Sequence, residues 1–210
     1  MTVFEHFLMG GSLGLAAGLH RRFGWQPVAL SAVAATLPNW DGLSILFGRG
    51  AFATSHRVWG HSLLTAGAAG VLAGVLAYQF NVFGRLQRWG ARRFLKEIPP
   101  PVEHPGFSVP TLAVWALVGL LAVYSHLLAD YFYPGYPYLQ TWPIQLLWPV
   151  GDKGWSAAIV PGGRLETVGI FVVGMFAVWR WPRHAQSIAC LSLICLAIYV
   201  AVWWPLGSHS

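Results

Sequence analysis

Long apolar runs occupy most of this 210-residue chain, and they restrict it to a membrane fold. Hydrophobic residues make up 56% of the sequence and charged residues only 10%, against about 25% in an ordinary soluble domain. We therefore predict an all-α fold, a polytopic helical membrane bundle that forms a single domain over residues 1–210.

About six apolar segments can be drawn along the chain. They cover approximately residues 7–19, 25–37, 58–80, 109–130, 166–181 and 185–204. The first two are short, because a full membrane span takes roughly 20 residues. We expect these two to form a helical hairpin that is tilted, buried within the bundle, or extended at its ends.

Small residues recur at helix-packing spacing in two of the segments. Gly10, Gly14 and Gly18 are four residues apart, as are Gly70 and Gly74. This spacing lets helix backbones approach closely in lipid. Residues 85–107 lie between the third and fourth segments. Their first half contains five basic residues and is followed by three consecutive prolines at 99–101, so we predict a basic interfacial helix that the prolines terminate.

The basic residues predict an orientation. With the N-terminus outside, nine basic residues fall on the inner side and four on the outer side, the sense of the positive-inside rule. The inner set is Arg21, Arg22, Arg85, Arg88, Arg92, Arg93, Lys96, Arg180 and Arg183, and the outer set is Arg49, Arg57, Lys153 and Arg164. The net charge of +6 is thus spread over short topological segments, and we do not expect a nucleic-acid partner.

Seven histidines and carboxylates lie at the ends of the apolar segments, and this orientation places all of them on the outer face. They are His6, Asp41, His56, His61, His126, Asp130 and Glu166. Charged and imidazole side chains are costly at membrane depth and persist mainly where they pair, bind something or line a wet cavity. We expect this set to bind a divalent metal, because imidazole suits zinc and other transition metals.

Two motifs carry most of that expectation. His56 and His61 lie in a dense polar run and either ligate a metal or cap a helix at the interface. His126 and Asp130 are one helical turn apart. They either ligate a metal together or form an interhelical hydrogen-bonded pair.

The remaining candidates are ambiguous when each is taken alone. Asp41 lies in a Leu-Pro-Asn-Trp-Asp-Gly turn, Glu166 suits a helix N-terminus, and His6 suits the interface. As part of a metal site, Glu166 or Asp41 would be the general base. Arg57 would stabilise charge developing on a phosphate oxygen.

In order along the chain, the motifs resemble a known family. They are His6, Leu-Pro-Asn-Trp-Asp at 37–41, His-Arg-x-x-Gly-His at 56–61, Ser-His-Leu-Leu-Ala-Asp at 125–130, Leu-Leu-Trp-Pro at 146–149 and Leu-Glu at 165–166. They resemble the membrane-bound metal-dependent hydrolases, also described as LexA-binding, inner-membrane-associated hydrolases of the YdjM type. The resemblance covers residues 1 to about 170. It implies an all-helical fold, zinc held by His and Asp, a distant relationship to zinc-dependent phospholipase C, and phosphoester hydrolysis.

The chain departs from the family pattern at two positions. Asn39 stands where the family usually has Asp, and Gly60 where it usually has Thr. With one carboxylate fewer, one or two metals are as plausible as three.

We predict a hydrolase of a bacterial or archaeal inner membrane, with its site on the non-cytoplasmic side and a lipid or lipid-linked phosphoester as substrate. Two other interpretations remain open: a non-catalytic regulatory or scaffolding membrane protein, and a metal-ion transporter or sensor that uses the same residues.

Overall fold

The computed structural model of the chain describes residues 1–94, 108–133, 142–157, 159–160 and 164–207. Helices make up the described fold, with one isolated bridge between Ile144 and Trp155. The helices are α1 (Val3–Ala16), α2 (Leu19–Arg22), α3 (Trp25–Ala34), η1 (Leu37–Phe47), α4 (Arg49–Ser55), α5 (Leu63–Gln79), α6 (Val82–Phe94), α7 (Val109–Phe132), α8 (Leu165–Arg180), η2 (Pro182–His184) and α9 (Ala185–Gly207). The predicted all-α class is confirmed for this part of the chain.

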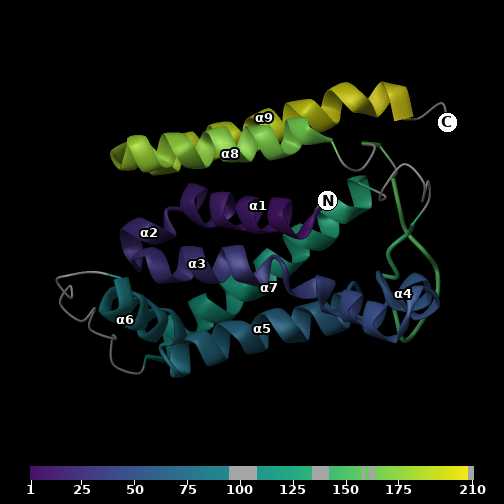
Figure 1. The fold of residues 1–210 in the computed structure, drawn as a ribbon, viewed down its shortest axis with the longest axis horizontal. Helices are drawn as coiled ribbons and strands as arrows, with labels where there is room; N and C mark the ends of the chain where they lie inside the picture. The colour runs from purple at the N-terminus through teal and green to yellow at the C-terminus, as the bar shows by residue number, and fades with distance from the viewer. Residues whose placement is uncertain (95–107, 134–141, 158, 161–163, 208–210) are drawn as a thin grey trace.

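The number of membrane crossings is smaller than six apolar segments suggest. Among the described residues, two helices are long and apolar enough to span a membrane, Val109–Phe132 and Pro182–Trp204. A third span arises if α5 and α6, which are bent by 58° at their junction, count as one. Helices α1 and α3, at 14 and 10 residues, lie between the longer helices in Figure 1.

The third segment begins later than predicted. We expected a helix from residue 58, but α5 starts at Leu63, where the Ser62 side chain accepts a hydrogen bond from the Thr65 backbone N–H. The preceding residues form a turn instead, and Arg57 takes a left-handed backbone conformation with φ of +66°. This turn frees His61 from the helix and lets it face the bundle.

The glycines pack two helix pairs, as predicted. A Cβ on Gly10 would lie 2.4 Å from the Ser31 backbone oxygen, so α1 and α3 are in backbone contact there. A Cβ on Gly70 would lie 2.6 Å from the Gly119 oxygen, which joins α5 to α7. Gly18 has a different role: with φ of +70° it precedes α2 in a turn.

The two ends of the bundle differ in character. Helices α2 and α6 and the junction of α8 with α9 lie at one end (Figure 1), and these elements carry eight of the nine basic residues assigned to the inner side. The ninth, Lys96, lies outside the described residues. The amino terminus, α4 and the C-terminal end of α7 lie at the opposite end. The predicted separation of basic residues from the His/Asp set therefore corresponds to the two ends of one bundle.

Candidate metal centre

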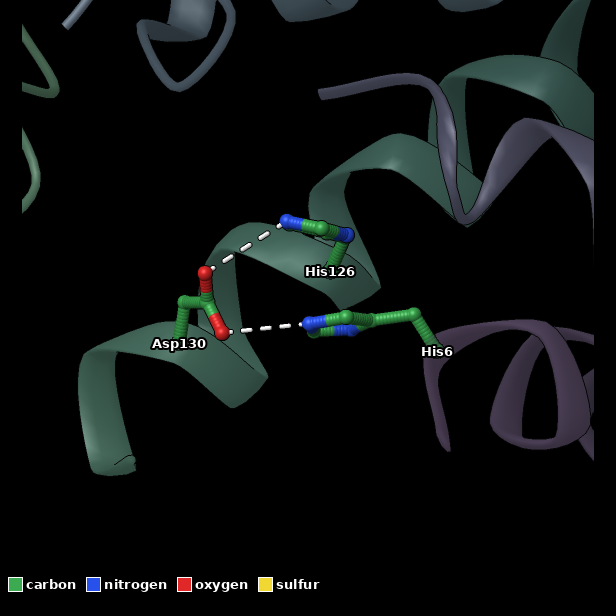
Figure 2. A group of neighbouring side chains, drawn as sticks. All are labelled: His6, His126 and Asp130. Carbon is green, nitrogen blue, oxygen red and sulfur yellow. Dashed lines mark hydrogen bonds and ion pairs between the residues drawn. The ribbon is translucent and has the colours of Figure 1, made fainter. Parts of the chain in front are cut away.

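Residues from four separate regions of the chain meet at the end of the bundle away from α2 and α6. His6 comes from the first turns of α1 and Asp41 from η1. His56 and His61 flank the turn before α5, and α7 contributes His126 and Asp130. Two groups of three donors result, and within each group the candidate ligand atoms lie within 4.8 Å of one another: His6 with His126 and Asp130, and Asp41 with His56 and His61. Figure 2 shows His6 and His126 approaching the two oxygens of the Asp130 carboxylate from α1 and α7.

The two groups are in direct contact through His61. Its Nε2 lies 3.1 Å from Nε2 of His126 and 3.3 Å from Oδ2 of Asp130. These three atoms form a triangle, whose third edge, from His126 Nε2 to Asp130 Oδ2, is 3.5 Å. All three side chains are at most 2% exposed. The donors thus form one buried network that extends across both groups.

Hydrogen bonds fix which nitrogen of each imidazole faces the triangle. Nδ1 of His126 donates to the backbone oxygen of Ala35 at 2.7 Å, and Nδ1 of His61 donates to Oδ2 of Asp41 at 2.9 Å. A carbonyl and a carboxylate only accept, so both Nδ1 atoms carry the proton. In the neutral rings the two facing Nε2 atoms are then bare lone pairs 3.1 Å apart, an arrangement that requires a cation or a proton between them.

Asp41 orients the histidines on its side. Its Oδ1 accepts from Nδ1 of His56 at 2.7 Å, and its Oδ2 accepts from His61 and from the backbone N–H of Gly60 at 3.0 Å. Burial alone would raise the pKa of Asp41, but the hydrogen bonds from His56 and His61 outweigh it and lower the pKa to about 2. Asp41 is therefore ionised at any physiological pH.

Comparison with known proteins agrees with this picture at the level of the family. A family model described as YdjM inner membrane protein matches residues 1–206. The chain belongs to this family. It is therefore an inner membrane protein, consistent with its apolar helices. No curated protein matches the chain, and no solved structure matches it.

The donor set in this YdjM family member fits a divalent metal. Zinc is held by imidazole and carboxylate at about 2.0–2.2 Å, so neighbouring ligands in a tetrahedral site are roughly 3.3 Å apart. The triangle of His61, His126 and Asp130 has edges of 3.1 to 3.5 Å. A metal-bound histidine usually donates its other ring nitrogen to a carboxylate or a backbone carbonyl. Asp41 accepts in this way from His61, and Ala35 from His126.

His6 takes a different position from the other two histidines. Its Nε2 lies 3.1 Å from Oδ1 of Asp130, and its ring stacks on His126 with the centroids 3.6 Å apart. Its Nδ1 is buried and has no hydrogen-bond partner in the described structure. The amino group of Met1 lies 2.9 Å from the same Asp130 oxygen.

Arg57 contacts Oδ2 of Asp130, whereas His6 contacts Oδ1. Its guanidinium lies 3.2 Å from Oδ2 of Asp130 and donates to the backbone oxygens of Tyr133 and Trp142, and the residue is 4% exposed. The left-handed backbone of Arg57 costs roughly 1–2 kcal/mol for a residue with a Cβ. We predicted that Arg57 contacts a phosphate, whereas the contacts in the structure make it a buried counter-charge that positions Asp130.

Glu166 does not join the network. Its side chain is 53% exposed, its ion-pair partner is Arg164 at 3.6 Å, and it belongs to neither group of donors. Besides Asp41 and Asp130, Glu5 is a buried carboxylate at this end of the bundle, at 3% exposure. Glu5 accepts hydrogen bonds from the Thr2 backbone and hydroxyl and from the Thr167 hydroxyl, and so ties the start of α1, which carries His6, to α8.

Glu5 was detectable in the sequence. The capping box Thr2-x-x-Glu5 is a standard helix-start pattern, but nothing in that pattern indicates that the carboxylate is buried.

The two departures from the family pattern have different structural settings. The side-chain nitrogen of Asn39 is buried and has no partner in the described structure. Gly60 is enforced by a close approach: a Cβ there would lie 2.0 Å from the Pro38 backbone oxygen and 3.1 Å from Cγ of Asp41. A threonine side chain at position 60 would not fit this arrangement of η1 and the turn.

Gly60→Ala is therefore expected to damage both stability and metal affinity. The added methyl must push η1 away from the turn, which we expect to cost about 1–3 kcal/mol of unfolding free energy. Because His61 and Asp41 move apart, zinc affinity should fall about 10–100-fold. Thermal unfolding and chelator competition measure the two effects. Gly50→Ala is the matched control, because a Cβ at Gly50 meets no atom within 4 Å; equal behaviour of the two variants would contradict the prediction.

Proposed function

We propose that the network of His and Asp residues is the centre of a metal-dependent hydrolase that cleaves a phosphoester. The observation that carries the proposal is the triangle of His61, His126 and Asp130. The Nδ1 hydrogen bonds of both histidines fix their rings so that the two Nε2 lone pairs face each other. These three residues would hold one zinc-type ion, and His6, whose Nε2 lies 3.1 Å from Oδ1 of Asp130, completes the set. With Asn39 in place of a carboxylate, we favour one ion over three.

The metal and the protein contribute different parts of the chemistry. A divalent metal supplies Lewis acidity: it polarises a phosphoryl oxygen and makes water nucleophilic at neutral pH. Arg57 holds the Asp130 carboxylate, and Asp41 holds His61, so that both keep their orientation without substrate.

His56 replaces Glu166 as our proposed general base. Its Nδ1 donates to Asp41 at 2.7 Å, which leaves Nε2 as the proton acceptor. Its side chain is 14% exposed, in contrast to the buried His61. The ring is held between Phe52, which stacks on it, and the edge of Trp142. A carboxylate behind an imidazole is the arrangement that orients the base in many hydrolases.

Location supports a substrate that reaches the site at the membrane surface. Apolar side chains at the same end of the bundle are highly exposed: Leu46 is 79%, Phe47 86% and Val150 92% exposed. Exposed apolar patches on elements that flank a site indicate contact with lipid or a partner. Together with the positive-inside count, this favours a lipid phosphoester on the non-cytoplasmic side.

Transport is less favoured than hydrolysis. Between Leu63 and Gln79 in α5, and between Val109 and Val123 in α7, the sequence has no charged residue or histidine. Since an ion path through a membrane needs polar groups along its length, the cluster is a site at one end of the bundle and is not continued through these two helices.

A substrate screen tests the proposal. We expect purified, zinc-loaded protein to hydrolyse phosphodiesters such as bis(p-nitrophenyl) phosphate or phospholipid headgroups, and to lose the activity with a chelator and regain it with zinc. Metal binding without turnover of any phosphoester would leave the scaffolding interpretation in its place.

Metal binding should depend steeply on pH. Burial alone would lower the pKa of His61, but the hydrogen bonds that its ring donates to the carboxylates of Asp130 and Asp41 outweigh burial and raise the pKa. Without metal, a second proton on the His61 ring makes it a cation, and this proton lies between the facing Nε2 atoms of His61 and His126. As pH falls through the raised pKa, protons therefore displace the metal, while Asp41 stays ionised. We expect zinc to be lost below about pH 6 and protons to be released on zinc binding at neutral pH. Elemental analysis after dialysis measures the loss; unchanged zinc at pH 5 would contradict it.

A further inference from the structure

An apolar cavity of about 360 Å³ lies between α1, α7 and α9, beside the candidate metal centre. Ligand pockets range from roughly 300 to 1,000 Å³. Its wall is almost wholly aliphatic or aromatic, and includes Met9, Leu13, Leu128, Phe132, Leu196 and Val200. Two of its walls, α7 and α9, are the helices long and apolar enough to span the membrane. The cavity therefore lies at a depth where its natural occupant is a hydrocarbon.

The cavity reaches the metal centre at one end. Ala129 lines it and immediately precedes Asp130, and Met1 lines it while its amino group contacts the Asp130 carboxylate. On the same end Tyr133 lines the cavity, and its backbone oxygen accepts from Arg57. An occupant that extends along the cavity thus brings its end to the side chains that hold the metal.

An unpaired polar group marks this end. Tyr133 is only 3% exposed, yet its hydroxyl has no hydrogen-bond partner in the described structure. A buried hydroxyl without a hydrogen-bond partner is unfavourable, so a ligand that supplies an acceptor is favoured there. An apolar cavity with one unpaired hydroxyl donor at its end matches a chain that carries an ester at its head.

We propose that this cavity binds one acyl chain of a glycerophospholipid, with the ester oxygens at Tyr133 and the phosphate at the His/Asp network. The inference rests on the proposed function for the role of the phosphate, but the binding of the chain is testable without turnover. The lipid enters sideways from the bilayer between α7 and α9, where Leu128 is 59% exposed.

The test uses full-length protein in nanodiscs doped with a phosphatidylethanolamine that carries a diazirine in one acyl chain. Irradiation and peptide mapping should place cross-links on the cavity walls of α1, α7 and α9. Ala197→Trp fills the cavity from α9 and should reduce these cross-links roughly tenfold, since two buried CH₂ groups are worth about that factor. Leu13→Phe fills it from α1 and should act in the same direction.

Ile198→Trp is the matched control, because Ile198 is the neighbouring α9 residue, is 58% exposed and does not line the cavity. It should leave the labelling unchanged. Tyr133→Phe removes the unpaired hydroxyl and should weaken labelling by the phospholipid while leaving labelling by a diazirine alkane unchanged. Zinc content of each variant confirms that the metal centre is intact.

The outcomes separate the two proposals. Cavity labelling that Ala197→Trp abolishes, in protein that hydrolyses no phosphoester, supports the acyl-chain site and overturns the hydrolase. Phospholipid hydrolysis with the same KM in Ala197→Trp and wild type, with labels spread evenly over the lipid-facing helices, overturns the acyl-chain site and keeps the hydrolase. If both hold, Ala197→Trp raises KM for the long-chain phospholipid and leaves kcat for bis(p-nitrophenyl) phosphate unchanged.

Discussion

The double variant His61→Ala, His126→Ala should bind no zinc at concentrations that saturate the wild-type protein. The two imidazoles supply two of the three mutually close donor atoms, at 3.1 Å from one another, and only Asp130 remains of the triangle. Loss of a single outer partner of a metal ligand costs about 10–100-fold in affinity, so loss of two ligands should exceed that range. Elemental analysis of detergent-solubilised protein, with chelator competition, measures the effect.

The control is a second pair of histidines at the other end of the bundle. His20 lies in α2 and His184 in η2, at the end that carries the basic residues. The variant His20→Ala, His184→Ala removes the same number of imidazoles and should keep the full zinc content. Zinc retained by the His61, His126 variant, or no zinc in wild type after loading with zinc or manganese, would remove the metal centre and with it the hydrolase.

Pattern and spacing in the sequence were sufficient to predict which residues gather at one end. His126 and Asp130 share a helical face because they are four residues apart, and the segment ends place His6, Asp41 and His61 near them. The resemblance of these motifs to the YdjM family is confirmed by the match over residues 1–206, while the hydrolase activity that it implies stays a prediction. Glu166 fails this reasoning because it lies on the exposed face of α8, where it pairs with Arg164, while its neighbour Thr167 is buried.

What each side chain does depends on contacts that spacing cannot reveal. Asp41 was predicted as a ligand or base, yet its two oxygens are occupied by His56, His61 and the Gly60 backbone. That arrangement exists because Gly60 lets the turn lie against Pro38, a contact between residues 22 positions apart. The number of spans also differs from the number of apolar segments, because α1 and α3 end at Ala16 and Ala34, too soon to cross a bilayer.

Asp130→Asn should be the most destabilising single change in the chain even without metal. The substitution keeps the shape of the side chain but removes the only carboxylate within ion-pair distance of the Arg57 guanidinium in the described structure. Arg57 is 5% exposed at its side chain and cannot turn to water. Breaking a buried pair by removing one partner typically costs about 3–5 kcal/mol, because the other charge stays buried and uncompensated. Denaturation of chelator-treated protein in micelles isolates this effect from metal binding.

The double variant Arg57→Gln, Asp130→Asn distinguishes an ion pair from a packing defect. If the buried charge causes the loss, the double variant should be more stable than the sum of the two single changes predicts, with a coupling of about 0.5–3 kcal/mol. Asp152→Asn, at an exposed carboxylate, should stay within about 0.5 kcal/mol of wild type. Equal unfolding free energies of the Asp130 and Asp152 variants would contradict the prediction, because they would show that the Arg57 charge is solvated. Asp130 would then not need Arg57 as a counter-charge in order to be available as a metal ligand.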